Sequence, residues 1–423
     1  YKLTAPLIID ISIFPTSPLA IGGQFEIIPF NVCQQTITMS GLAASGTFTI
    51  TYNSNTTTAI AWNASPATIQ AAVQLLPGLS QAQVTGCVNN QLLTIWFYGV
   101  YGASVSAITA TSSLLTGASG AITFTIATPV TGESWATAIT RTQSVVSYAG
   151  AMVNETAATI GATDVANAAS TIQALNMVGF VVSYTAADIN TGGMLDLFRS
   201  GSQTQMRGLF YYDSSVANSI TGYNALIYMA AYAGRALSTN FNGSNTTQTM
   251  HLKGLQNAQP DANITQTLLT TAQAAGADCY VNLQGVPKVF CSGANSFFDQ
   301  VYNLVWLVGA LQVAGFNFLA TSSTKIPQTE QGMDGLKTAY RSVMEQAVSN
   351  QYLAPGSWTS STTFGIQVDF INNISQRGYY IYSSPISQQS ATARAARQAT
   401  IVQIAAKQAG ALHSSSVIVN INA

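Results

Sequence analysis

Short apolar runs divide the first third of the chain into predicted strands. Residues 7–14 (LIIDISIF) form one such run, which Pro15 ends, so a strand is expected near the N-terminus. Alternation of apolar and polar positions with a period of two predicts further strands at residues 47–52, 92–98 and 121–127. The pattern is typical of a β-rich module.

One short helix is predicted between the first two of these alternating strands, in the segment SPATIQAAVQLLPG. Ser65 suits the N-cap position, Pro66 takes the first helical position, and Pro77 with Gly78 ends the helix. Residues 34–131 contain no Lys, Arg, Asp or Glu. This change in composition predicts a separate inserted domain.

Helices and strands alternate after this domain. Thr163 is the expected cap of the first helix. The predicted helices cover residues 163–177, 194–200, 223–237, 264–275, 297–319 and 332–352, and the predicted strands cover residues 178–183, 208–212, 278–283, 378–383 and 417–422. Such an order requires crossover connections, which predicts an α/β body with a partly parallel sheet.

Two segments need separate comment. Residues 297–319 form a long apolar segment, but polar residues including Asp299, Asn303, Gln312 and Asn317 interrupt it, so a buried core helix is expected and no membrane insertion. Residues 391–413 are ambiguous, because the alanine-rich composition favours a helix while Ile401, Gln403 and Lys407 also suit a strand.

The fold class expected from these patterns is mixed α/β, with four parts. Residues 1–33 form an N-terminal arm and the start of the core, and residues 34–131 form the inserted β-rich domain at the periphery. Residues 132–390 form the α/β core, and residues 391–423 form a C-terminal segment that ends in a strand. A chain of 423 residues is long enough for several domains.

The amino-acid composition restricts the classes of function to be expected. Charged residues make up 7% of the chain, against about 25% in ordinary soluble domains, while 48% are hydrophobic. A surface built from neutral residues causes little repulsion between copies and suits a protein packed against itself. The net charge of −1 offers no basic patch for a phosphate backbone, so no nucleic-acid partner is expected. No signal peptide is recognised at the start of the given sequence, which begins with Tyr1.

No catalytic or cofactor motif is present. The sequence lacks a phosphate-binding loop, a G-x-S-x-G elbow, an H-E-x-x-H helix and a paired C-x-x-C, so we expect no enzyme, no cofactor and no metal site. The carboxylates are scattered and are interpreted as caps, turns and solvated positions, although a glycosidase pair is the alternative. They are Asp164, Asp188, Asp196, Asp213, Asp261, Asp278, Asp299, Asp334 and Asp369.

The cysteines and histidines offer little chemistry. A hairpin turning near residues 284–287 would set Cys279 opposite Cys291, but free thiols are favoured over a disulfide. The histidines, His251 and His413, are too few for a metal site or for general base catalysis.

A local basic excess precedes the predicted terminal strand. It consists of Arg394, Arg397 and Lys407. Such residues form either a solvated face or an electrostatic contact with an acidic neighbour in an assembly.

Five segments in the C-terminal third carry a family resemblance. They are FFDQVYNLVWL at residues 297–307, TKIPQTEQGMDGL at 324–336, AVSNQYLAPGSW at 347–358, RGYYIYSSPISQQS at 377–390 and KQAGALHSSSVIVNIN at 407–422. In this order they resemble the contractile tail sheath proteins of myovirus-type bacteriophages. The charge-free domain resembles the β-rich insertions that vary among phage structural proteins.

The resemblance implies a structural virion subunit, assembled in the host cytoplasm as stacked hexameric rings of a helical sheath. Its implied partners are other copies, the tail tube protein, and the baseplate and tail terminator proteins. The apolar chain ends suit strand addition to a neighbour's sheet, and contraction would drive the tube into the host envelope. The residues expected in these arms are Leu7, Ile8, Ile9, Ile11, Ile13, Val417, Ile418, Val419 and Ile421.

Other functions stay open from the sequence. Another virion polymer, such as a tail tube, baseplate or capsid component, shares the low charge, but tubes are normally built from smaller β-barrel subunits. A carbohydrate-active hydrolase is a second alternative. A secreted surface-layer protein is a third.

Overall fold

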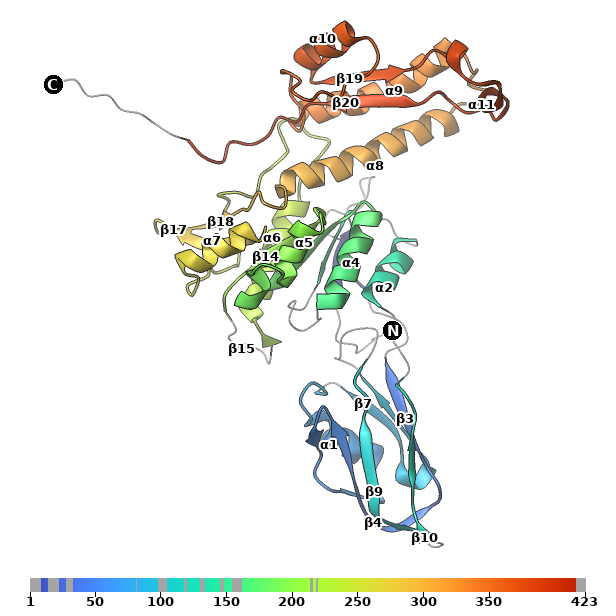
Figure 1. Cartoon of the computed structure of the whole chain (residues 1–423), viewed down its shortest axis with the longest axis vertical. Coiled ribbons are helices and arrows are strands. Elements are labelled where there is room, and N and C mark those ends of the chain that lie inside the picture. The colour runs from blue at the N-terminus through green and yellow to red at the C-terminus, as the bar shows by residue number, and fades with distance from the viewer. Residues whose placement is uncertain are drawn as a thin grey trace, which may run out of the picture. The chain divides into compact units, whose positions relative to one another are not determined.

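A computed structural model describes residues 9–13, 23–27, 33–80, 82–97, 105–117, 120–129, 134–144, 148–153, 162–213, 216–217 and 220–415. The chain forms two compact units, Tyr1–Met229 and Ala230–Ala423. Both units contain helices and strands (Figure 1). The predicted mixed α/β class is therefore confirmed.

Two antiparallel sheets in the first unit form a β-sandwich. Their strands are β3 (Gln34–Met39), β4 (Ala43–Tyr52), β5 (Asn55–Thr56), β6 (Ile60–Ala61), β7 (Gln83–Cys87), β8 (Leu92–Trp96), β9 (Thr109–Gly117), β10 (Gly120–Ala121) and β11 (Phe124–Ile126). One sheet has the order β10-β9-β4-β5, with β6 also paired to β4, and the other has the order β11-β3-β8-β7. The 3-10 turn η1 (Val88–Asn90) joins β7 to β8.

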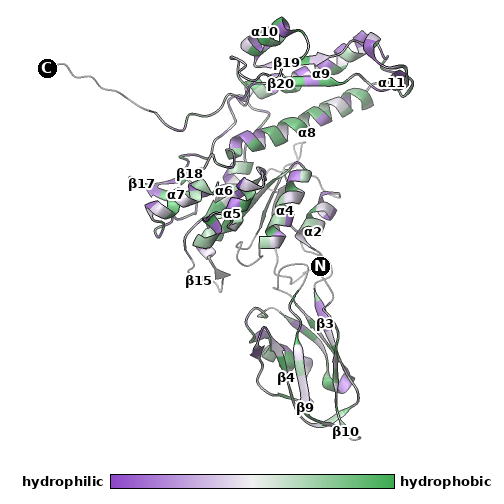
Figure 2. Cartoon of the chain, viewed as in Figure 1, coloured by the Kyte–Doolittle hydropathy of each residue, from purple (hydrophilic) through white to green (hydrophobic). Residues whose placement is uncertain are grey.

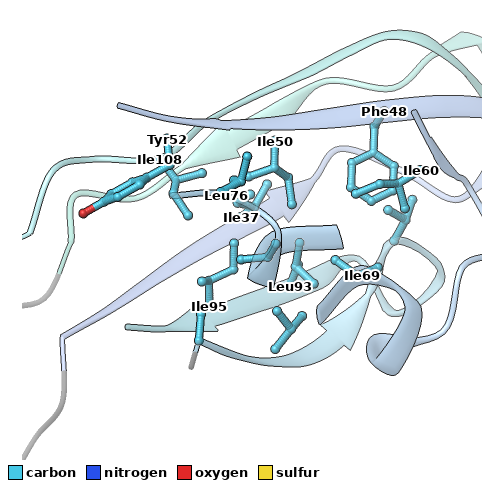
Figure 3. Close-up of a cluster of buried hydrophobic side chains, with 14 of the residues drawn as sticks. Ile37, Phe48, Ile50, Tyr52, Ile60, Ile69, Leu76, Leu93, Ile95 and Ile108 are labelled. Carbon is cyan, nitrogen blue, oxygen red and sulfur yellow. The ribbon is translucent and has the colours of Figure 1, made fainter. Parts of the chain in front are cut away.

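Alternating apolar residues from both sheets fill the sandwich core. Ile37 and Ile95 come from one sheet and Phe48 and Ile50 from the other (Figure 3), and all four are buried. Helix α1 (Pro66–Gln74) adds to this core, and its predicted cap is confirmed, because the Ser65 hydroxyl accepts a hydrogen bond from the Thr68 amide at 3.2 Å.

The sequence predicts two of the sandwich strands well and a third incorrectly. The predicted strands at 47–52 and 92–98 correspond to β4 and β8. The single strand expected at 121–127 is instead two short strands, since β10 pairs with β9 and β11 pairs with β3. Ile122 lies between them and is buried in the core, so the chain passes from one sheet to the other at this point. The predicted domain boundaries at 34 and 131 stay a prediction.

A partly parallel sheet also belongs to the first unit, as predicted. β12 (Gly150–Val153), β13 (Val178–Ser183) and β14 (Met206–Phe210) run parallel. β1 (Ile9–Ile13) is antiparallel to β12 on one side and to β2 (Gly23–Ile27) on the other. All residues of β13 and β14 are buried, which explains why both strands are largely apolar, with Arg207 of β14 as a buried charged exception.

Helices accompany this sheet. They are α2 (Trp135–Gln143), α4 (Ala162–Ala174), η2 (Ala186–Ile189), α5 (Met194–Ser200) and α6 (Tyr223–Leu237), with the small hairpin β15 (Val216–Ala217) and β16 (Ile220–Thr221) before α6. Thr163 lies inside the first turn of α4, so the prediction that it caps the helix is wrong. A Cβ atom on Gly179 would lie 2.5 Å from Ile172, so this glycine lets α4 approach β13.

The second unit begins with the end of α6, followed by α7 (Gln266–Ala274) and the hairpin of β17 (Asp278–Leu283) and β18 (Val286–Phe290). Gln284 and Gly285 both have positive φ, as a two-residue type I′ turn requires. Cys279 pairs with Phe290 rather than with Cys291, so the predicted opposition of the cysteines is wrong by one residue. Neither cysteine forms a disulfide and both are buried, as favoured from the sequence, and burial raises the pKa of Cys279.

The C-terminal part of the second unit combines helices with a small sheet. It contains α8 (Phe298–Ala320), α9 (Glu330–Ser349), α10 (Gln367–Arg377), β19 (Tyr379–Ser383), η3 (Ile386–Gln388), α11 (Ala391–Ala395) and β20 (Val402–Ala406). The ambiguous segment 391–413 thus contains both a helix and a strand. Helix α10 was not predicted from the sequence.

The buried side chain of Gln35 joins three segments of the sandwich by hydrogen bonds. Its substitution tests how much these bonds stabilise the fold. Gln35 is 2% exposed, and its Nε2 donates to the carbonyl oxygens of Ala127 at 2.8 Å and Ile108 at 3.1 Å, while its Oε1 accepts from the Ile108 amide at 2.7 Å. We expect Gln35→Leu to lower the free energy of unfolding by about 2–4 kcal/mol, because buried backbone groups lose their partners. Urea denaturation measures the change. Gln34→Leu, on the opposite face of the same strand, is the control and should cost less than about 0.5 kcal/mol.

Candidate assembly surfaces

The small sheet of β19 and β20 is the central feature of the C-terminal part. The strands are antiparallel, from the pair Tyr379 and Ala406 to the pair Ser383 and Val402. Side chains of β19 enter two different clusters. Tyr379 packs with Met344 of α9, and Tyr380 lies 5.4 Å from Phe370 of α10 between ring centroids. Both faces of the sheet are therefore covered.

The edges of this sheet differ from its faces. Within the described residues, β19 and β20 pair only with each other. Neither strand contains a charged residue or proline, the residues that commonly block strand addition at an exposed edge. After β20 the chain continues beside another segment, because the Ala354 amide donates to the Lys407 oxygen at 3.1 Å and the Ala409 amide donates to the Tyr352 oxygen at 2.9 Å. Over the length of the two strands, no further strand in the described part of the chain pairs with either outer edge.

The structure describes part of the predicted arms. Ile9, Ile11 and Ile13 lie in β1, whose backbone pairs with β2 and β12 of the same chain. The remaining predicted arm residues lie outside the described residues. They are Leu7, Ile8, Val417, Ile418, Val419 and Ile421. Exchange of either arm stays a prediction.

The predicted basic residues do not form one patch. Arg394 and Arg397 are exposed on one turn, where the Arg397 amide donates to the Arg394 oxygen at 3.0 Å. Lys407 is half-buried instead, and its stem lies over Gly356, where an added Cβ would be 2.7 Å from the lysine Cε. In the described part of the chain, no ion pair involves these three residues. For Arg394 and Arg397, a solvated face and an electrostatic contact with an acidic neighbour both stay predictions.

Helix α8 has two different halves. Its first half is buried, as predicted, and includes Tyr302, whose pKa is raised by burial. In its second half, by contrast, Val313, Phe316 and Leu319 are 44%, 70% and 61% exposed, although Figure 2 shows most of the helix as hydrophobic. The expectation of a buried helix is wrong here, because α9 covers only the side of α8 that carries Gly315, against which Tyr340 packs. By length and composition alone, α8 could also cross a membrane.

Several of the carboxylates, among them Asp196 and Asp278, act as internal hydrogen-bond acceptors. The Gly192 amide lowers the pKa of Asp196 most, burial acts in the opposite direction, and Arg199 lowers it further. Asp278 accepts from the Ser292 amide at 2.7 Å and from the Tyr232 hydroxyl at 2.7 Å. Among the described residues, no group of three or more His, Cys, Asp or Glu side chains could hold a metal ion. These contacts give Asp196 and Asp278 structural roles.

A groove of about 530 Å³ lies beside the N-terminal end of α8. Amide side chains dominate its polar lining, including Gln300, Asn303 and Gln408, and Asp299 is its one ionisable carboxylate. Such a lining offers hydrogen bonds but no paired acid and base. It does not favour a hydrolase.

Comparison with known proteins bears on the same region. Residues 298–421 match the family model described as E217 tail sheath protein gp31-like, C-terminal domain. The match begins at the first residue of α8 and includes β19 and β20. No curated protein matches the chain. The match supports a phage tail sheath family and a structural rather than enzymatic role, in agreement with the resemblance found in the sequence.

The junction between α10 and β19 provides a test of the small sheet. Gly378 has φ +82°, and an added Cβ would lie 2.8 Å from the backbone carbon and oxygen of Ala354. We expect Gly378→Ala to lower the free energy of unfolding by more than about 2 kcal/mol, because it adds backbone crowding to the cost of the left-handed conformation. Gly410→Ala is the matched control, since Gly410 also has a positive φ but nothing lies within 4 Å of the added Cβ. Urea denaturation should separate the two variants, and equal losses would contradict the role of the contact with Ala354.

Proposed function

We propose that this chain is the repeating subunit of a contractile phage tail sheath, which polymerises around the tail tube by exchange of terminal strands. The observation that carries the proposal is the small sheet in the sheath-like domain. Its faces are covered by helices, whereas its two edges are unpaired within the described residues. A neighbour's strand fits such an edge.

Energetics favour completion of this sheet. A two-stranded sheet is only marginally stable by itself, and additional strands or packed helices are needed. Each backbone hydrogen bond to an added strand contributes about 1 kcal/mol net, and burial of a valine or isoleucine side chain contributes about 1.5–3 kcal/mol. The sequence VIVNIN at residues 417–422 supplies four such apolar side chains. A short strand can therefore form a strong link between subunits.

The N-terminal arm would be exchanged differently. β1 already lies between β2 and β12 of its own chain. In a swap, the β1 strand of a neighbour forms the same two ladders, so the exchange costs little beyond the entropy of association. The chain thus offers an addition site at β19 and β20 and a swap site at β1.

In this proposal, contraction is possible because the strand ladders that link subunits differ from the contacts between subunit bodies. The ladders persist while the subunit bodies slide from a metastable extended lattice into a more stable compact one. No nucleotide hydrolysis is required. The low charge of the chain suits this movement, because few ion pairs between bodies have to be broken. Stacked hexameric rings, with baseplate and tail terminator proteins at their ends, complete the proposed assembly.

Removal of the C-terminal strand tests the proposal. We expect a chain truncated after Ser415 to fold but not to polymerise, because the neighbour's sheet edge then receives no strand. Val419→Pro should act similarly, since proline removes a ladder donor. Val419→Thr retains the amide and a β-branched side chain, so it should still assemble.

Sedimentation velocity and negative-stain microscopy measure the assembly of these variants, and thermal unfolding confirms that each one is folded. Normal tubes formed by the truncated chain would count decisively against strand exchange at this end. Loss of folding in Val419→Pro alone would place residue 419 in the subunit's own core and count against its donation.

A further inference from the structure

The two histidines of the chain meet in the second unit, although they lie far apart in the sequence. The ring centroids of His251 and His413 are 4.6 Å apart and the ring planes are 28° from parallel. Two phenylalanine rings extend this contact. The Phe297 ring meets His413 edge-on at 4.5 Å, and the Phe290 ring lies 5.2 Å from His251. The histidine pair is thus part of an aromatic cluster.

Hydrogen bonds fix the protonation state of His251. The Cys291 amide donates to Nδ1 of His251 at 3.1 Å, so this nitrogen is unprotonated and the ring is neutral. A proton added at Nδ1 would point at the amide hydrogen and break this bond. Thr249 connects the two histidines, because its hydroxyl shares a hydrogen bond with Nε2 of His413 at 3.0 Å and accepts one from the His251 amide at 3.4 Å.

The surroundings oppose protonation of His251. Burial lowers its pKa most and the neighbouring His413 lowers it further, whereas Asp278 and a hydrogen bond with the His413 backbone act in the opposite direction. Asp278 affects the His251 pKa through its charge, and the Cys291 amide contacts the His251 ring. The Asp278 carboxylate already accepts two hydrogen bonds, from Ser292 and Tyr232. Two protonated imidazoles at this distance would also repel each other.

His413 holds an otherwise exposed segment. The chain from Gly410 to Ser415 is exposed except at His413, and Leu412 is 99% exposed. Ala409, just before this segment, is still held by the hydrogen bond that its amide donates to the Tyr352 carbonyl oxygen. Within the described part of residues 410–415, the ring contacts and the hydrogen bond to Thr249 come from His413. Loss of the histidine stack would therefore release this segment.

We propose that the His251–His413 stack is a pH-sensitive latch, which holds residues 410–415 on the body of the second unit at neutral pH and releases them on acidification. The latch determines where the chain leaves the body before its last residues. It does not depend on the proposed strand exchange, because the held segment precedes residues 417–422.

The direction of the pH effect follows from linkage. The released state has the ordinary histidine pKa of about 6.5, and the latched state binds a proton less readily. The latch is therefore fully stable above about pH 6.5 and weakens as the pH falls below this value. Each proton taken up on release changes the equilibrium by up to about tenfold per pH unit.

Hydrogen exchange and histidine NMR test the latch in the full-length chain. Carbon-13 labelling at Cε1 of histidine yields two resonances, one for each ring. We expect His251 to titrate below pH 6.5 and the His413 resonance to shift and sharpen over the same range. Amide protection around residues 249–251 and 411–415, corrected for intrinsic exchange, should fall between pH 7.5 and 5.5, by at most about tenfold for the uptake of one proton.

His413→Phe separates the latch from a general effect of acid. A phenyl ring keeps the stack and accepts a protonated His251 against its face, so the segment should stay protected at pH 5.5. His413→Ala should leave it unprotected at both pH values. The sandwich contains no histidine, so peptides around α1 should exchange equally at both pH values. Unchanged protection of the wild-type segment on acidification would overturn the latch, as would an equal loss in His413→Phe.

Discussion

The near absence of charge is the constraint on which the structure depends, because most buried backbone groups must find neutral partners. Gln35 in the sandwich and Asn350 in the second unit meet this need in the same way. The side-chain Nδ2 of Asn350 donates to the Phe241 carbonyl oxygen at 3.2 Å, while its Oδ1 accepts from the Tyr352 backbone amide at 3.0 Å. A carboxamide supplies both a donor and an acceptor without the cost of burying a charge. Loops far apart in the sequence are thereby fixed without ion pairs.

The same constraint shapes the outside of the molecule. Natural sheet edges are commonly protected by lysine, proline or inward-pointing charges, and exposed apolar faces are kept small. β19 and β20 lack such protection, and the second half of α8 exposes Phe316 and Leu319. In a dilute monomer both features favour aggregation. In a subunit of an ordered polymer they become contacts, which agrees with the sheath-like family of this region.

Sequence patterns predicted the elements whose environment is set by their own chain. β13, α5, α6 and β17 have the expected bounds, because a continuous apolar run or a cap and stop signal defines each one. Helix α10 was missed, since only Phe370 and Ile374 of its eleven residues are buried. The predicted position of Cys279 opposite Cys291 was wrong by one residue, because the Gln284-Gly285 turn sets the register of the hairpin.

The candidate site was harder to predict for a physical reason. The sequence indicated apolar chain ends, but an edge that accepts them is defined by missing neighbours rather than by a residue pattern. The contact between His251 and His413 was also missed, because a pair so distant in the sequence has no local signal. The one signal in the sequence was that the chain contains only two histidines.

An assembly that must hold together and also move needs two kinds of contact. A backbone ladder has a strict register, because a slip of one residue turns every side chain to the opposite face. It therefore breaks or persists as a unit. A contact through an apolar helix face, such as the exposed end of α8, is non-directional and tolerates small shifts. In the proposed sheath, ladders at the chain ends would keep subunits connected, and the weakly charged bodies would change neighbours at low cost.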